Sequence, residues 1–104
     1  MAFKAIILLK RKADLSSQDF STWWLNDHAK LAAQLPGLRK LCFNLSTDED
    51  APYDGVSELW FDSKEAFEAA YADEIGQAVA VDSQSMVSQR LRLFVTEHVV
   101  HESC

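Results

Sequence analysis

Four apolar segments of strand length and two amphipathic segments of helical period follow one another along the chain in the order βαββαβ. The 104 residues leave room for one hydrophobic core, so residues 1–104 are expected to form a single domain. These observations predict an α+β protein of the ferredoxin-like class, in which a four-stranded antiparallel sheet carries both helices on one face.

The first strand is expected at residues 2–10, an Ile- and Leu-rich run that ends in a charged cluster. Ser16 or Ser17 then offers a side-chain oxygen for the N-cap of a helix. This helix is expected to continue to about Gln34, because the Pro36-Gly37 pair that follows stops a helix.

The second and third strands are expected at residues 38–46 and 53–61. A short acidic segment separates them, so the two strands are expected to form a hairpin. Asp62 or Ser63 then caps a second helix. The apolar residues that recur at helical spacing in this helix are Ala66, Phe67, Ala70 and Tyr71.

The end of the chain has the weakest pattern. Residues 73–89 are expected to form a short extra helix and a loop around Gly76 and Met86. Residues 90–100 then form the last strand, and 101–104 are left as a tail.

Both faces of the predicted sheet carry apolar side chains. Residues on one face of the first strand are Phe3, Ala5, Ile7 and Leu9, and those on the other face are Ile6 and Leu8. In the last strand the corresponding sets are Leu91, Leu93, Val95 and Val99 against Phe94 and Val100. Two helices cover only one face of the sheet, so a second copy of the chain is expected on the other, in an isologous homodimer.

His28 is the strongest candidate for a catalytic residue. At about 100° per residue it lies on the shoulder of the apolar helix stripe that contains Phe20, at the edge of the predicted core. Desolvation there disfavours the charged imidazole, so His28 can act as a neutral general base on a carbon acid beside a carbonyl. The alternative is a structural histidine that donates a hydrogen bond to a backbone carbonyl.

Side chains near His28 are candidates for a pocket that binds a small hydrophobic, aromatic or lactone ligand. Of the adjacent Trp23 and Trp24 we favour Trp24, which lies one turn before His28. If Glu58 is buried, its carboxylate needs a partner, and His28 can be that partner. The alternative is that Glu58 lies at a solvated strand end and needs no partner. The substrate-binding candidates are Trp24, Tyr53, Glu58, Trp60, Phe67 and Tyr71, and the aromatic members are equally explained as core residues.

Charge and cysteine content argue against several kinds of partner. The net charge is −6 and the one basic cluster is Lys10–Lys12, so no nucleic acid is expected. No apolar run approaches the roughly 20 residues of a membrane helix, and the N-terminal pattern is not that of a signal peptide. Cys42 and Cys104 provide neither a disulfide framework nor metal-ligand spacing. We therefore expect no metal, no cofactor and a cytoplasmic location.

Several segments resemble the EthD-like members of the dimeric α+β barrel superfamily. These are the opening residues 4–12, the helix end 24–28 with the Leu-Pro-Gly-Leu turn at 35–38, and the segments 58–63 and 94–97. Together they span nearly the whole chain, and the helical histidine followed by Leu-Pro-Gly is the most specific of them. The resemblance implies a homodimer with a pocket between the helices and the sheet of each subunit.

Relatives in this family include 4-methylmuconolactone methylisomerase and polyketide cyclases or dehydratases. They transfer protons on lactones or polyketones without a metal or an organic cofactor, and the helical histidine of the methylisomerases corresponds to His28. Those enzymes have another histidine before the third strand, where this chain has residues 48–51, Asp-Glu-Asp-Ala. A different substrate is therefore expected.

Three functions follow from these residues and this resemblance. The first is an enzyme that uses His28 for cofactor-free proton transfer, in an isomerisation, cyclisation or dehydration of a carbonyl or lactone substrate. The second is a non-catalytic accessory protein that carries a hydrophobic ligand for an oxygenase, as in ether degradation. The third is a haem-dependent monooxygenase with a single histidine on the iron.

Overall fold

The computed structural model describes residues 3–103, and their backbone forms a four-stranded antiparallel sheet of order β2-β3-β1-β4. The strands are β1 (Phe3–Arg11), β2 (Lys40–Leu45), β3 (Gly55–Phe61) and β4 (Val87–Val95). β1 therefore lies between β3 and β4, as it does in a ferredoxin-like sheet. The α+β fold class predicted above is confirmed. Ala2 and Cys104 lie outside the described residues.

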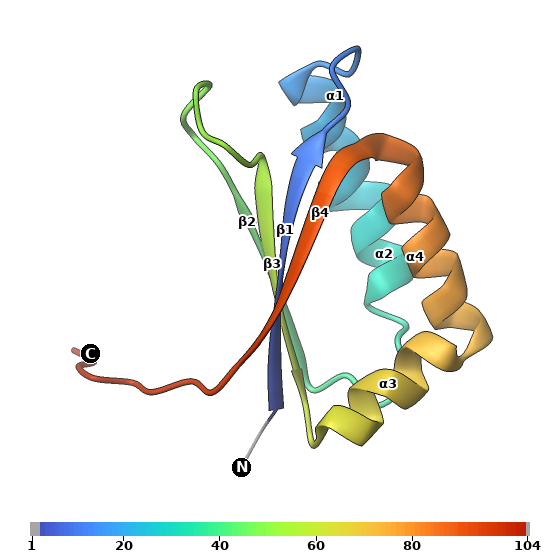
Figure 1. Cartoon of the computed structure of the whole chain (residues 1–104), viewed down its shortest axis with the longest axis vertical. Helices are drawn as coiled ribbons and strands as arrows, with labels where there is room; N and C mark the ends of the chain where they lie inside the picture. Colours follow the sequence, from blue (N-terminus) through green and yellow to red (C-terminus); the bar gives the residue numbers. More distant parts are fainter. Residues whose placement is uncertain (1–2, 104) are drawn as a thin grey trace.

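The helices cover one face of this sheet (Figure 1). The first helical run consists of α1 (Ser17–Thr22), a π-helical segment η1 (Trp23–His28) and α2 (Ala29–Ala32). The Ser16 side chain accepts a hydrogen bond from the Asp19 amide at its start, as expected of an N-cap. The run ends shortly before Gly37, whose φ of 78° lies in the left-handed region that favours glycine.

The second helical segment, which follows β3, is longer than the sequence predicts. α3 (Lys64–Ala72) begins at the predicted cap Ser63, and α4 (Glu74–Met86) then extends over 13 residues. The extra helix expected within residues 73–89 is therefore confirmed, whereas its short length and the loop expected around Gly76 and Met86 are wrong. Gly, Asp and Ser lower the helix propensity of α4, and its burial of Val79 and Ser83 together with the Asp73 N-cap stabilises it instead.

The last strand begins and ends earlier than predicted. β4 covers Val87–Val95 and not residues 90–100, and it pairs with β1 along its length. Residues 96–103 form no helix or strand and run away from the body on the side opposite the helices (Figure 1). Val99 and Val100 on this segment are exposed.

The hydrophobic core lies between the sheet and the helices. β3 alternates strictly, with Ser57, Leu59 and Phe61 buried against the helices. Its intervening side chains lie on the other face. The largest fully buried side chains are Trp24, Phe20, Phe61, Leu9 and Leu59.

The face of the sheet away from the helices is apolar and uncovered in the single chain. The register places Leu8 opposite Leu91 and Ile6 opposite Leu93 on this face. Leu91 and Leu93 are neighbours on this face of β4 and are 45% and 47% exposed, so together they leave an apolar surface uncovered. The predicted alternation of the first and last strands is confirmed for these residues.

Candidate functional site

The π-helical segment η1 determines which tryptophan lies beside His28. A π-turn relates residues five apart, whereas an α-turn relates residues four apart. Trp23 therefore aligns with His28, and their ring centroids are 4.8 Å apart. Both side chains are buried, as is Trp24. Because π-helical turns are rare and recur at functional sites, this local geometry marks His28 as a positioned residue.

Asp82 on α4 holds the His28 ring. Its Oδ2 lies 2.8 Å from His28 Nδ1, and its Oδ1 accepts a hydrogen bond of 3.3 Å from Trp23 Nε1. A carboxylate only accepts hydrogen bonds, so the proton of the neutral ring is assigned to Nδ1. Nε2 then carries the lone pair, and it makes no hydrogen bond within residues 3–103.

Burial lowers the pKa of His28 below its usual value of 6.5, although the hydrogen bond and the charge of Asp82 oppose this shift. The positive charge of Arg90 also lowers it. The ring is therefore neutral at neutral pH, with its basic nitrogen unprotonated. A neutral imidazole oriented by a carboxylate is suited to act as a general base.

His28 lines a small cavity between the sheet and the helices, with a volume of about 20 Å³. The wall is largely apolar, with contributions from β1, β2, β3 and α2. Five side chains bring polar atoms to it, namely His28, Ser57, Tyr71, Ser83 and Arg90. Each comes from a different helix or strand, so the cavity exists only in the folded chain.

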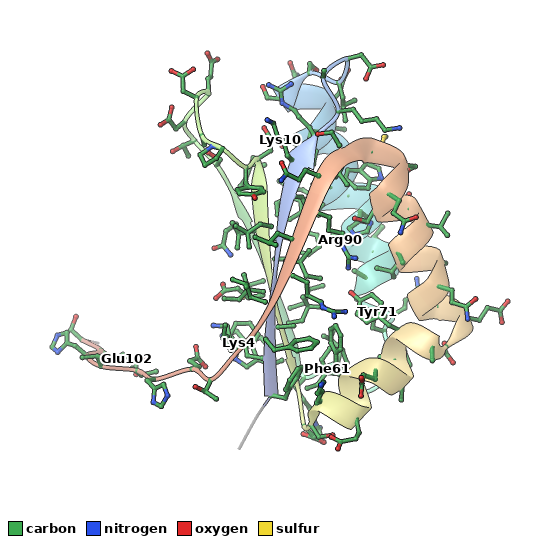
Figure 2. All side chains as sticks on the ribbon, in the orientation of Figure 1. Lys4, Lys10, Phe61, Tyr71, Arg90 and Glu102 are labelled. Carbon is green, nitrogen blue, oxygen red and sulfur yellow. The ribbon has the colours of Figure 1, made fainter. Side chains whose placement is uncertain are left out.

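Of the predicted binding residues, Tyr71 lines this cavity with His28. Burial raises the pKa of the Tyr71 hydroxyl, while the charges of Arg90 and Arg92 lower it in part. The phenol is therefore protonated at neutral pH and can donate a hydrogen bond. Figure 2 shows Tyr71 extending from α3 into the space between the helices and the sheet.

Trp24 lies in the core and does not line the cavity. It is fully buried, stacks on Phe43 with ring centroids 4.3 Å apart, and covers Gly55. A Cβ atom at Gly55 would lie 2.6 Å from the Trp24 ring, so the two residues are closely matched. The preference for Trp24 over Trp23 as the neighbour of His28 assumed α-helical spacing, which η1 does not have.

Glu58 and Trp60 face the uncovered side of the sheet, away from His28. Lys4 Nζ lies 2.9 Å from Glu58 Oε1 and 3.2 Å from Glu97 Oε2. Trp60 Nε1 donates to Glu97 Oε1, and the Lys4 ammonium lies over the Trp60 ring. The pairing of Glu58 with His28 is therefore wrong. Alternation along β3 directs Glu58 to the face of the sheet opposite the one that His28 packs against, and Lys4 is the partner of Glu58.

The two remaining candidates also lie outside the cavity. Tyr53 lies just before β3 and lines a surface hollow with Leu8 and Val56. Phe67 is buried in an aromatic cluster whose members include Phe61 and Tyr71. Phe67 therefore packs against Tyr71, with ring centroids 4.9 Å apart.

Sequence reasoning missed Asp82 and Arg90, the two charged residues that shift the pKa of His28. The sequence predicts that the segment containing Asp82 is partly loop, and it predicts Arg90 only as the first residue of a strand. A signal was present at Arg90, because alternation with Leu91 and Leu93 places it on the face that carries the helices. No local pattern identifies the pairing of Asp82 with His28.

The cavity does not fit a haem group. Its volume of about 20 Å³ is far below that of a porphyrin, and the His28 ring packs between Trp23 and Phe43. Within residues 3–103, His, Cys, Asp and Glu side chains form no group of three that can hold a metal ion. In the same part of the chain, no helix has the length and apolarity to cross a membrane.

The sheet order, the helices on one face and the cavity beneath them define a ferredoxin-like α+β protein with a site between its two layers. The EthD domain model matches residues 12–90, and the chain belongs to the EthD domain family. The predicted family is thus confirmed. Comparison with curated protein sequences gives no match.

Solved structures share the fold over nearly the whole chain. An ethyl tert-butyl ether D (EthD) family protein from Bacillus halodurans has a TM-score of 0.82 and 22% identity, covering 94% of this chain and 100% of its own. A dimeric ferredoxin-like protein of unknown function from Thermobifida fusca has a TM-score of 0.77 and 19% identity, covering 93% and 92%. SnoaB from Streptomyces nogalater, a cofactor-independent oxygenase, has a TM-score of 0.69 and 14% identity, covering 92% of each chain.

Proposed function

We propose that this protein is a cytoplasmic, homodimeric enzyme that uses His28 for cofactor-free proton transfer on a small carbonyl or lactone substrate. Isomerisation, cyclisation or dehydration are the reactions this step serves. The single observation that carries the proposal is the pair formed by His28 and Asp82, with Nδ1 and Oδ2 2.8 Å apart. The match to the EthD domain model, together with the resemblance to enzymes that transfer protons without a cofactor, supports it.

The pair supports a defined proton path. His28 Nε2 takes a proton from the carbon beside a carbonyl, and the electron pair of the C–H bond moves toward the carbonyl oxygen to give an enolate. Asp82 stabilises the imidazolium that forms and keeps the ring in one tautomer. In an unsaturated substrate the enolate extends over the neighbouring C=C bond, so return of the proton to the far carbon of this dienolate completes an isomerisation and restores neutral His28.

The size of the cavity limits how a substrate binds. A volume of about 20 Å³ holds about one water molecule, so a substrate must displace part of the lining. Tyr71 and Arg90 are the long, half-buried side chains of that lining, and their movement enlarges the site. The largely apolar wall of the cavity favours a second candidate, an accessory protein that carries a hydrophobic ligand without converting it.

We propose the homodimer on the uncovered face of the sheet. Ile6, Leu8, Leu91 and Leu93 form an apolar surface there, and residues 96–103 extend on the same side. A second copy placed with two-fold symmetry covers this surface with its own. The structural neighbour from Thermobifida fusca and two further ferredoxin-like neighbours are dimeric proteins, which supports the proposal.

Deuterium exchange tests the enzyme against the accessory protein. A panel of β-diketones and unsaturated lactones is incubated in deuterium oxide, and NMR follows loss of the proton beside each carbonyl. We expect wild type to accelerate exchange for at least one compound and His28→Gln to abolish it. The matched control is His98→Gln, an exposed histidine that contacts Thr96.

Two outcomes would count against the enzyme. Equal exchange in wild type and His28→Gln would remove His28 as the base. Tight binding of a compound by both proteins, with exchange by neither, would instead favour the accessory protein. Assays that show activity are repeated with and without dioxygen. This comparison distinguishes an isomerisation from an oxygenase reaction, since SnoaB is a cofactor-independent oxygenase.

A further inference from the structure

Arg90 projects from β4 into the space between the sheet and the helices, toward Tyr71 (Figure 2). Its Cα partner on β1 is Leu9, a core residue, so its side chain shares the buried face of the sheet. The Arg90 Nε atom is buried and has no hydrogen-bond partner within the described residues. No ion pair with a carboxylate is formed by Arg90 in residues 3–103 either.

A buried N–H group of a cation without a partner is unfavourable, because the group has lost water and gained nothing in exchange. Because Arg90 lines the cavity, a ligand bound there can supply the missing acceptor. The strongest acceptor for a guanidinium is an anionic oxygen.

Arg90 shares the cavity with His28 and Tyr71. Its positive charge lowers the pKa of both groups, which places the guanidinium within electrostatic reach of the base and of the phenol. Three kinds of chemical group therefore meet at one small cavity. These are a neutral base, a cation with an unused N–H group, and a hydroxyl that can donate.

We propose that Arg90 and Tyr71 bind the oxygen of the substrate carbonyl, and that this oxygen becomes an enolate oxyanion when His28 removes the neighbouring proton. The inference deepens the proposed function and rests on it. The C–H bond breaks, the proton moves to His28 Nε2, and the negative charge that develops on oxygen is stabilised by Arg90 Nε–H and the Tyr71 hydroxyl. The substrate class is thus an enolisable carbonyl compound whose reacting end is small.

Formate serves as the probe, since it is the smallest carboxylate and carries an anionic oxygen. Formamide is its neutral counterpart of similar size. Binding is followed by NMR through the Arg90 Nε–H and His28 ring signals during titration. We expect saturable binding of formate by wild type, with formamide at least about tenfold weaker.

Arg90→Gln tests the site, and Arg92→Gln is the matched control. Arg92 lies two residues along the same strand but over the rings of Phe67 and Phe94, outside the cavity. We expect Arg90→Gln to weaken formate binding by about tenfold or more and Arg92→Gln to change it less than twofold. Arg90→Lys retains the charge without Nε and is expected to bind formate with intermediate affinity.

Formate binding unchanged in Arg90→Gln, or formamide bound as well as formate, would overturn the inference, since Arg90 would then not be the group that recognises an anionic oxygen. His28→Gln separates this result from a failure of the proposed function, because it removes the base and leaves Arg90 in place. Formate bound by His28→Gln, with no deuterium exchange in wild type, would sustain the anion site and defeat the enzyme. Exchange that persists in Arg90→Gln at the wild-type rate would defeat the role of Arg90 alone.

Discussion

Asp82 Oδ2 lies 2.8 Å from His28 Nδ1 although the two residues are 54 positions apart in the chain. The contact joins α4 to η1 and gives the histidine a partner that also accepts from Trp23. It is therefore both a bond between two helices and the orienting contact of the proposed base.

Replacing Asp82 with Asn tests this orienting role. The amide keeps the size of the side chain but loses the charge that stabilises an imidazolium, so we expect exchange activity to fall by about tenfold or more. The pKa of His28 is expected to fall further, because Asp82 raises it in the wild type. The matched control is Asp27→Asn, an exposed carboxylate on η1. NMR titration of the ring measures the pKa, and a His28 pKa unchanged by Asp82→Asn would contradict the role.

The stability of the protein should depend on pH through His28. Its pKa is lowered in the folded state, so between that value and about 6.5 the unfolded chain binds more protons than the folded chain. Stability therefore rises with pH through this window and falls on acidification, by at most about 1.4 kcal/mol per pH unit for one group. Urea unfolding at fixed protein concentration should show this slope in wild type and a flatter one in His28→Gln. Parallel curves for the two proteins would show that His28 is not the group responsible.

A charge on the uncovered face should prevent dimer formation. Leu93→Glu places a carboxylate in the apolar surface, and burying it against a second copy is unfavourable. We expect sedimentation to show a dimer for wild type and a monomer for the variant. Val81→Glu is the control, since Val81 is 67% exposed on α4 and lies on the helical side. A monomeric wild type at micromolar concentration would refute the proposed homodimer.

The contact between Gly55 and Trp24 should be sensitive to one added methyl group. A Cβ atom at residue 55 would lie 2.6 Å from the indole, so Gly55→Ala is expected to destabilise the fold by about 1–3 kcal/mol. The smaller ring of Trp24→Phe relieves the clash, so the double variant should lose less stability than the two single changes added together. Additive losses in chemical denaturation would mean that the two side chains do not press on each other.

The sequence by itself determined the layers of this protein. Alternation along residues 3–9 separates a core face from an apolar outer face, and Ser16 and Ser63 cap helices where predicted. These features depend on neighbouring residues and on a regular period, which a sequence displays directly. His28 was identified in the same way, from its place at the edge of an apolar stripe.

Only the tertiary structure decided which residues meet in the cavity. The π-helical turn shifted Trp23 toward His28, the packing of α4 on η1 brought Asp82 to its ring, and β4 presented Arg90. These relationships depend on how separate elements pack, and a weak local pattern such as that of α4 carries no information on its distant partner. Glu58 shows the converse, because a one-residue step along β3 places a side chain on the opposite face of the sheet and pairs it with Lys4.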